Sequence, residues 1–534
     1  MTAVTCKIKE YIQPFERELA LAELRALSGD DPVPVDGSAQ AALSFRVNSK
    51  VSAENLRTHL AYWEAVSTQT TGITQQLRGE ATSLIARNGL ALNDMPDLVP
   101  RLVDEKTLNR RCLRYATHGL HEYRGKFFPQ LVRSLINMAE VPRRGIVLDP
   151  MCGSGTTLVE TVLAGRRAFG LDMNPLSVFL SEVKCQALAL DPRELIGTYE
   201  TLTASLKKPL RKRSPGGHFA SLDASDQDYL EKWFAPHVLD ELDYIRSAID
   251  GLSLAPMRSL YTLSLSNILR EVSWQKLDDL RVRKEVRRIE TKDVLQRYLE
   301  ETLRATKMVV AYNAQRGIKG LGVHEVHESD ARLAVRALPK LKGRVDAVIT
   351  SPPYATALPY LDTDRLSLIY LNLLPRSDHR TRDTLMIGNR EVTGRKRQSY
   401  WDYYEENRQD LPKATCSMID QIDSLNKQSD EVGFRRRNLS ALLSKYFFDM
   451  KAVIEQQREL LADHGTMFMV IGNNRTTAGG VPVEIRTTDH LAKIAESVGF
   501  RLAGNLSMDM LVSRDIFRNN AMPSEQIITL QKAQ

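Results

Sequence analysis

The 534-residue sequence contains only five cysteines, and no two of them form a CxxC pair. This scarcity argues against a disulfide framework and a structural zinc site, and it favours a reducing compartment. No apolar run approaches the roughly 20 residues that span a bilayer. No apolar segment follows the charged N-terminus, as it would in a signal peptide. We therefore expect a cytoplasmic protein with no membrane partner.

Positive charge is only slightly in excess of negative charge. Lysine and arginine number 73 against 66 acidic residues, which gives a formal net charge of +7. This excess suits a polyanionic partner, but it equally fits a basic protein that has none. The chain is too long for one hydrophobic core, so we expect roughly two or three domains.

The patterns along the chain predict an α/β fold with helical additions. Residues 1–110 have helical spacing and carry no evident chemistry, so an accessory role, DNA contact and a plain structural role all remain open. After them, strands alternate with helices, which predicts a parallel sheet with right-handed crossovers. About seven strands can be counted, which predicts a seven-stranded Rossmann-like sheet. The expected catalytic domain comprises 111–190, 320–375 and 441–534, with helical insertions at 191–319 and 376–440.

A glycine-rich turn follows the first strand of this pattern. Gly153-Ser154-Gly155 stands between a strand and a helix, where a ligand can approach the backbone at the positive end of the helix dipole. Asp172 ends the next strand, the position that binds ribose hydroxyls in dinucleotide folds. The GK[ST] of a P-loop and the full GxGxxG of a nicotinamide site are absent. A nucleoside-containing cofactor is therefore a better interpretation than a tight turn without a ligand.

A second motif, Ser351-Pro352-Pro353-Tyr354, comes directly after an apolar strand. Two consecutive prolines end a strand ladder and hold the backbone in a rigid, extended turn. The turn carries free carbonyls, a hydroxyl and an aromatic ring, which together can accept hydrogen bonds from a planar amino group and stack on its ring. A surface turn is the alternative. The preceding strand and the glycine turn upstream favour a catalytic role.

Three segments in this order resemble the S-adenosylmethionine-dependent amino-group DNA methyltransferases, the cytosine-N4 and adenine-N6 type. Residues 149–157 resemble the cofactor loop, 350–354 the catalytic tetrapeptide, and 118–129 the segment that folds over the methionine part of the cofactor. The Ser-Pro-Pro-Tyr variant is similar to the cytosine-N4 branch, whereas adenine-N6 enzymes more often begin with Asp. Met151 departs from the usual Phe, and Asp172 from the common Glu.

The resemblance implies two sets of site residues. No metal is expected, because His118 and His121 have no acidic or cysteine partner at ligand spacing, which favours loop packing. The implied catalytic residues are Ser351, Pro352, Pro353 and Tyr354. The implied S-adenosylmethionine-binding residues are Lys126, Phe127, Pro129, Asp149, Pro150, Met151, Gly153, Ser154, Gly155, Thr156, Thr157, Asp172, Met173 and Asp330. Within this set the resemblance implies that Asp330 bonds the cofactor adenine amine and that Asp149 lies near the methionine amino group.

Basic residues gather in the two expected insertions, in part beside aromatic residues. Such clusters suit phosphate contact and base stacking, although a solvated protein face is the alternative. The expected DNA contacts are Arg281, Arg283, Lys284, Arg395, Lys396, Arg397 and Tyr400.

These observations predict a site-specific DNA methyltransferase that moves a methyl group to the N4 amine of a flipped-out cytosine. No Pro-Cys pair occurs, which argues against cytosine-C5 methylation through a cysteine nucleophile. The alternatives are adenine-N6 methylation of DNA, N-methylation of an RNA base, and an inactive DNA-binding module. The expected partners are double-stranded DNA and a cognate restriction or defence-system protein, in a cytoplasm of bacterial or archaeal type.

Overall fold

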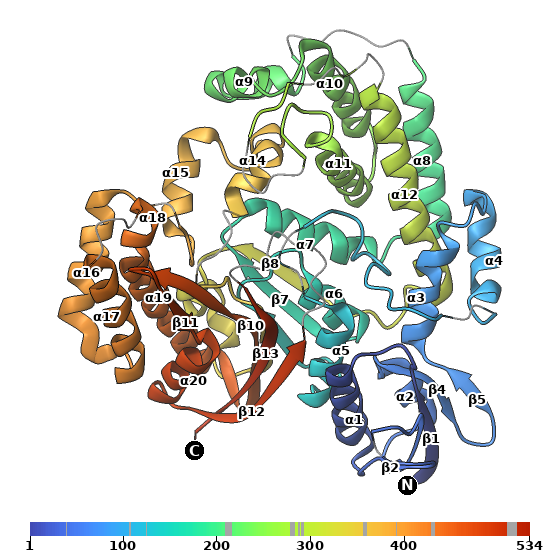
Figure 1. The fold of residues 1–534 in the computed structure, drawn as a ribbon. Helices are drawn as coiled ribbons and strands as arrows, with labels where there is room; N and C mark the ends of the chain where they lie inside the picture. Colours follow the sequence, from blue (N-terminus) through green and yellow to red (C-terminus); the bar gives the residue numbers. More distant parts are fainter. Residues whose placement is uncertain are drawn as a thin grey trace.

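A mixed β-sheet forms the centre of the computed structural model, with strand order β12-β13-β10-β9-β6-β7-β8 (Figure 1). The structure describes residues 1–38, 40–105, 108–123, 125, 127–208, 216–277, 283–286, 289, 293–355, 360–390, 392–428, 433–509 and 521–533. The strands of the sheet are β6 (Ile146–Asp149), β7 (Arg167–Asp172), β8 (His324–Glu328), β9 (Val345–Thr350), β10 (Leu461–Ala478), β12 (Phe500–Asp509) and β13 (Ala521–Lys532). The predicted seven-stranded Rossmann-like sheet is confirmed. One further strand, β11 (Val481–Ile485), pairs with β10 off this path.

The central strands are parallel and apolar because both faces of the sheet are covered. All four residues of β6 are buried, and β9 is buried at five of its six positions. Alternate residues supply different cores: Leu148 and Val348 belong to one, and Val147 and Ile349 to the other. The covering helices are α5 (Pro129–Met138), α6 (Thr156–Leu163), α7 (Pro175–Ala187), α13 (Ala334–Ala337), α19 (Leu439–Leu460) and α20 (Thr487–Ser497).

Parallel pairing brings the two sequence motifs together. β6 lies between β7 and β9, with Leu148 opposite both Phe169 and Val348. The carboxyl ends of these strands therefore meet at one edge of the sheet, where open α/β sheets bind ligands. A direct bond joins the motifs: Thr157 Oγ1 donates to the Ile349 carbonyl at 3.2 Å, across 192 residues of sequence.

The expectation of a helical region at 1–110 is wrong in part. Its helices α1 (Pro14–Ser28), α2 (Ala53–His59), α3 (Gln75–Ile85) and α4 (Met95–Leu102) accompany a five-stranded sheet of order β2-β3-β1-β4-β5. The strands are β1 (Thr2–Ile8), β2 (Val33–Pro34), β3 (Ser44–Ser49), β4 (Trp63–Ser67) and β5 (Thr71–Ile73). β1 pairs with β3 on one side and β4 on the other, and it buries Val4, Cys6 and Ile8 on one face, as a half-buried strand does.

The N-terminal region is joined to the large sheet through a buried carboxylate. Glu23 of α1 accepts hydrogen bonds from the amides of Ala61 (3.0 Å) and Tyr62 (3.1 Å) and from Asn137 Nδ2 of α5 (2.8 Å). Burial raises the pKa of Glu23 to about 7. The two parts also share one apolar core, which includes Leu19 and Val147.

The first insertion is a helical bundle, as predicted, and it stands over α7 at the top of the view (Figure 1). Its helices are α8 (Pro192–Leu206), α9 (Ala224–Glu231), α10 (Pro236–Asp250), α11 (Ala255–Leu269) and α12 (Asp293–Arg316). The later helices are α14 (Tyr360–Tyr370), α15 (Arg376–Leu385), α16 (Gly394–Asn407), α17 (Lys413–Lys427) and α18 (Phe434–Arg437). Within the described part of the chain, no helix is long and apolar enough to cross a membrane.

Candidate active site

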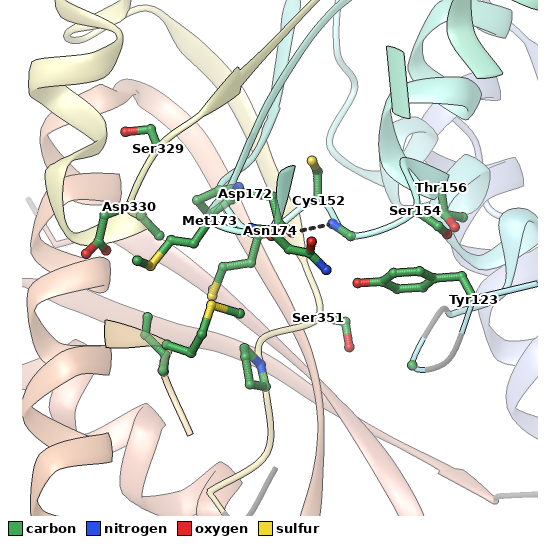
Figure 2. Close-up of a pocket in the computed structure, with 18 of the residues that line it drawn as sticks. Tyr123, Cys152, Ser154, Thr156, Asp172, Met173, Asn174, Ser329, Asp330 and Ser351 are labelled. Atoms are coloured by element: carbon green, nitrogen blue, oxygen red, sulfur yellow. Dashed lines mark hydrogen bonds between the residues drawn. The ribbon is translucent and has the colours of Figure 1, made fainter. Parts of the chain in front are cut away.

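A pocket of about 780 Å³, its open mouth included, lies at the carboxyl edge of the sheet (Figure 2). Predicted site residues that line it are Phe127, Pro150, Met151, Gly153, Ser154, Thr156, Asp172, Met173, Asp330, Ser351 and Pro353. The pocket thus combines side chains from both sequence motifs, as a single site for two reactants requires. Six other predicted residues do not line it but lie within two positions of a lining residue in the sequence: Pro129, Asp149, Gly155, Thr157, Pro352 and Tyr354. Lys126 lies outside the described residues.

The glycine loop packs so closely on α7 that only glycine fits. Gly155 has φ +77°, and a Cβ there would come within 2.7 Å of Ser181 Oγ and 2.9 Å of Ser181 Cα. Gly153 has φ +50°, and a Cβ there would meet the Tyr123 ring at 3.2 Å. Both positions need the left-handed backbone that glycine adopts without strain. The loop therefore leads from β6 directly into the first turn of α6.

Two carboxylates hold this loop in shape. Asp149 accepts a bond from Thr157 Oγ1 at 2.7 Å and one from the Met151 amide at 3.2 Å. Asp172 accepts from the amides of Gly153 and Asn174, both at 2.8 Å; the first of these bonds is the dashed line in Figure 2. Burial raises the pKa of Asp149 and that of Asp172 to about 6, against the bonds that lower them. Both groups consequently titrate close to neutrality.

The segment before the glycine loop is anchored by buried Glu160 of α6. This carboxylate accepts bonds from Tyr115 Oη (2.6 Å) and Arg133 Nε (2.8 Å), and it lies 2.8 Å from His118 Nε2. Burial acts to raise the pKa of Glu160, but Arg133 and His118 lower it overall. His118 is thus engaged in loop packing. Among the described residues, no group of three or more His, Cys, Asp or Glu could hold a metal ion.

The lining of the pocket fits S-adenosylmethionine. Apolar side chains such as Phe127 and Met151 offer walls for a flat base, and Asp172 offers acceptors for ribose hydroxyls. Ser154 Oγ is buried and finds no hydrogen-bond partner within the described chain. Because buried hydroxyls are normally bonded, this orphan points to a polar ligand group. Tyr123 and Asp330 lie at opposite ends of the pocket in Figure 2, with Met173, Asp172 and Cys152 between them.

Asp330 is held rigidly at the far end of the pocket. Its carboxylate accepts from the backbone amide of Arg332 at 2.9 Å and pairs with the Arg332 guanidinium at 2.6 Å. Arg332 also bonds Asp449 of α19 at 2.6 Å and the carbonyl of Leu385 at 2.8 Å. A carboxylate has about four lone-pair sites, and three N–H groups of Arg332 already donate to Asp330, so about one site is left for a ligand amine.

The Ser-Pro-Pro-Tyr turn leaves the end of β9 and borders the same pocket. Ser351 and Pro353 line it, and Ser351 lies on the Tyr123 side in Figure 2. The Pro353 carbonyl accepts a bond from Tyr446 Oη at 2.9 Å, and Tyr354 Oη donates to Glu525 of β13. A hydroxyl acceptor therefore faces the cavity that the glycine loop encloses, within reach of a ligand held there.

Eight lining residues were missed by the sequence analysis: Tyr123, Gly125, Cys152, Asn174, Ser329, Ala331, Met386 and Ile387. Tyr123 and Gly125 lie in the resembling segment 118–129, and Asn174 follows Asp172 as the cap of α7, so local signals existed for them. Met386 and Ile387 had no such signal, because they come from the expected insertion. Arg382 of α15 fastens that segment by bonding Glu328 at 2.6 Å.

The expected DNA contacts occupy two separate places. Arg395 and Lys396 are exposed on α16, and Arg397 lines a groove with Trp401, Lys427 and Arg437. Tyr400 lies 5.8 Å from Lys445 Nζ. Lys284 Nζ lies 4.7 Å from the Trp274 ring, and the Arg283 carbonyl accepts from the Lys276 amide. Arg281 lies outside the described residues.

The fold and the pocket together define a Rossmann-like methyltransferase, and comparison with known proteins agrees. Residues 120–201, which include the glycine loop and Asp172, match the family model UPF0020, described as an RMKL-like, methyltransferase domain. The Type II methyltransferase M.MvaI of Kocuria varians is 24% identical over 383 residues, 69% of this chain and 79% of that protein. For M.BsoBI of Geobacillus stearothermophilus the identity is 22% over 435 residues, 75% and 83% of the two chains.

A shorter similarity links the chain to an RNA-modifying enzyme. The tRNA (guanine(10)-N2)-dimethyltransferase of Methanocaldococcus jannaschii is 42% identical over 66 residues, 12% of this chain and 17% of that protein. The family model, M.MvaI and M.BsoBI confirm the resemblance inferred from the three motifs, and the protein is a methyltransferase. Methyltransferases of this family use S-adenosylmethionine as the methyl donor, so the predicted cofactor is confirmed as well.

Proposed function

We propose that the protein is a DNA methyltransferase that modifies the exocyclic N4 amine of a cytosine flipped out of the duplex. The observation that carries this proposal is the position of Ser351 and Pro353 in the pocket that Gly153 and Asp172 also line. An acceptor for an amino group and a site for a methyl donor therefore share one cavity. The relatives M.MvaI and M.BsoBI, both Type II DNA methyltransferases, support DNA as the substrate.

In this proposal the turn acts through hydrogen bonds and stacking, without a covalent intermediate. The Ser351 hydroxyl and the Pro352 carbonyl accept the two amine hydrogens, which localises the lone pair on nitrogen. Tyr354 stacks on the extruded base, whose amine is unreachable inside the duplex. The amine nitrogen then bonds to the methyl carbon as the carbon–sulfur bond breaks and its electron pair stays on sulfur, and the amine afterwards loses one proton to water.

The residues around the glycine loop have a complementary task in the proposal. S-adenosylmethionine, when bound, supplies an electrophilic methyl group. Phe127 and Met151 would pack on the adenine, Asp172 would accept from the ribose, and Asp330 from the adenine amine. Asp149 is buried behind the loop, so its contribution is to fix the loop and to place a negative charge near the methionine amino group. The other predicted cofactor residues remain predictions.

The proposed duplex contacts lie on the later insertion. Exposed Arg395 and Lys396 on α16 would neutralise phosphates, and Arg397 and Tyr400 continue the same helix. Replacing both Arg395 and Lys396 with alanine should lower the slope of log affinity against log salt by about 2, since each phosphate contact contributes about 1. An unchanged slope for this pair would remove α16 from the DNA surface.

One experiment tests the proposed function as a whole. The protein is incubated with duplex DNA and S-adenosylmethionine carrying a labelled methyl group, and the DNA is digested to nucleosides. The proposal expects label in N4-methylcytosine. Label in N6-methyladenine would keep the chemistry and change the base, and label nowhere would overturn the proposal.

A second candidate substrate is RNA, which the similarity to a tRNA guanine-N2 enzyme favours. The same assay with bulk tRNA and with DNA in parallel separates the two substrates.

The remaining alternative, an inactive DNA-binding module, is tested by calorimetry with S-adenosylmethionine, which such a module need not bind. All five cysteines are free thiols, which fits the expected cytoplasmic location. Pairing with a restriction or defence-system protein stays a prediction.

A further inference from the structure

We infer that Tyr446 and Glu525 are positioning residues that hold the Ser351–Tyr354 turn from two sides for methyl transfer. The inference rests on the proposed function of this turn and assigns roles to two side chains far from it in sequence. Tyr446 belongs to α19. Glu525 belongs to β13, which pairs with β10 on the side away from β9, the strand that leads into the turn. Neither side chain lines the pocket, so each acts only through the turn.

Tyr446 fixes the backbone of the turn. Its side chain is 1% exposed, and its hydroxyl donates to the Pro353 carbonyl at 2.9 Å. The ring packs edge-on against Phe447, with centroids 5.3 Å apart, so the hydroxyl has little freedom to move. This bond holds the Pro353 peptide group in one orientation, and the rigid Pro352-Pro353 backbone passes that orientation to the neighbouring Pro352 carbonyl. One bond thereby fixes the direction in which the acceptor carbonyl of the turn points.

Glu525 fixes the ring of Tyr354. The Tyr354 hydroxyl donates to the Glu525 carboxylate, and Glu525 pairs across the strands with Gly472 of β10. A Cβ at Gly472 would lie 3.4 Å from the Tyr354 ring, an ordinary van der Waals distance, so the ring rests close to the backbone of β10. Gly472 and Glu525 together hold the Tyr354 side chain, since they set the plane of its ring and the position of its hydroxyl.

Accurate placement matters because the turn has no other means of catalysis. Two acceptors and one stacked ring must meet an amine already aligned with a methyl group, and a 1 Å misplacement can cost about 100-fold in rate. The cofactor side of the pocket does not depend on these bonds, since its loop is closed by Asp149 and Asp172. Loss of either positioning residue should therefore slow transfer without weakening cofactor binding.

Conservative variants separate positioning from plain structural support. Tyr446→Phe removes one hydroxyl and keeps the ring that packs on Phe447. Glu525→Leu removes the acceptor at similar size, whereas Glu525→Gln keeps an oxygen that can accept from Tyr354. The matched controls are Tyr199→Phe, on a partly buried tyrosine of α8, and Glu496→Gln, on an exposed glutamate of α20.

The test measures single-turnover methyl transfer to duplex DNA and, by calorimetry, the cofactor dissociation constant. Tyr446→Phe and Glu525→Leu should lower the transfer rate by about 10-fold to 100-fold. Glu525→Gln and both controls should retain most of the rate. Every variant should bind S-adenosylmethionine within about twofold of the unaltered protein, as expected when only a step after cofactor binding is affected. Transfer rates equal to the controls, or a loss of cofactor affinity, would overturn the inference.

A spectroscopic readout decides the inference even if DNA is the wrong substrate. With 3-fluorotyrosine at position 354, the ¹⁹F resonance should move in Glu525→Leu and stay in place in Glu496→Gln, with no substrate present. An unmoved resonance in Glu525→Leu overturns the role of Glu525. If the unaltered protein transfers no methyl group but the resonance moves in Glu525→Leu, the proposed function is contradicted, whereas the role of Glu525 in positioning Tyr354 is supported.

Discussion

The two sides of the pocket are stabilised over very different sequence distances. On the cofactor side, Asp149 bonds Thr157 across 8 residues, and Asp172 bonds Gly153 across 19. On the target side, Tyr446 reaches Pro353 across 93 residues, and Tyr354 reaches Glu525 across 171. The glycine loop is thus closed by its own segment, whereas the Ser351 turn depends on the assembled sheet and on α19. Substitutions on the two sides should consequently affect different steps.

The largest expected effect comes from Tyr354. Tyr354→Ala should lower the rate of methyl transfer by about 100-fold, because stacking on an aromatic ring contributes up to ~3 kcal/mol per base. Cofactor affinity, measured by calorimetry, should stay nearly unchanged. Tyr354→Phe is the matched control, because it keeps the ring and loses the bond to Glu525. Its rate of methyl transfer should lie between those of the unaltered protein and Tyr354→Ala. Weaker cofactor binding in Tyr354→Ala would assign this ring to the cofactor side.

The reverse pattern is expected at Gly155. Gly155→Ala puts a Cβ against Ser181 at a left-handed backbone position, which should cost about 1–3 kcal/mol in the free energy of unfolding and weaken cofactor binding. Chemical denaturation and calorimetry measure the two effects. The control is Gly197→Ala within α8, where nothing lies within 4 Å and alanine should stabilise the helix by about 0.5–1 kcal/mol. Unchanged cofactor affinity in Gly155→Ala would show that the loop does not shape the site.

Cofactor affinity should also depend on pH through the carboxylates of the cofactor side. The pKa of Asp172 is raised from its usual 3.8 to about 6 by burial, so the neutral form is favoured below pH 6. Since the ionised form is the better acceptor for ribose hydroxyls, affinity should fall as pH drops through about 6, by up to about tenfold per unit. Asp172→Asn should bind more weakly and show a shallower profile, with Asp149 still titrating.

That pH dependence has a second signature. Because ligand binding favours ionised Asp172, protons should be released on cofactor binding near pH 6. Calorimetry in two buffers with different ionisation enthalpies measures this release directly. An affinity that rises as pH falls through 6 would contradict the assignment of Asp172 as an acceptor.

The smallest effect is expected at Arg382, which fastens the expected insertion to the cofactor side. Its pair with Glu328 is partly exposed, so its loss should cost at most about 1 kcal/mol. Arg382→Ala should weaken cofactor binding by up to about fivefold, since Met386 and Ile387 lose an anchor near the pocket. Arg380→Ala, an exposed neighbour on α15, is the control. Equal cofactor affinities in Arg382→Ala and Arg380→Ala would show that the Arg382 anchor does not affect the cofactor site.

The sequence predicts the cofactor side well because its signals are local. Asp149, Gly153 and Asp172 lie within one strand–turn–helix–strand unit, and the structure brings them to one edge of the sheet. The Ser351 turn was equally visible, since two prolines after an apolar strand restrict the backbone whatever surrounds it. The seven-stranded sheet follows from the same alternation of strands and helices.

The features that were missed depend on tertiary contacts. Residues 52–66 have helical spacing, but α2 ends at His59, and Trp63 begins β4, which pairs with β1. In β1, by contrast, the apolar residues Val4, Cys6 and Ile8 alternate along the sequence, and this local period-two signal was overlooked. Tyr446 and Glu525 gave no signal at all, because a lone tyrosine on a helix and a glutamate in a strand acquire their roles only when the sheet closes.

The most direct test of the account is the structure of the protein with duplex DNA and a non-reactive cofactor analogue. The decisive quantity is the distance from the exocyclic nitrogen of the target base to Ser351 Oγ and to the Pro352 carbonyl oxygen. The account predicts a flipped cytosine with both distances near 3 Å, within hydrogen-bond range. An amine held by other groups, or a target base still stacked in the duplex beside a filled cofactor pocket, would contradict it.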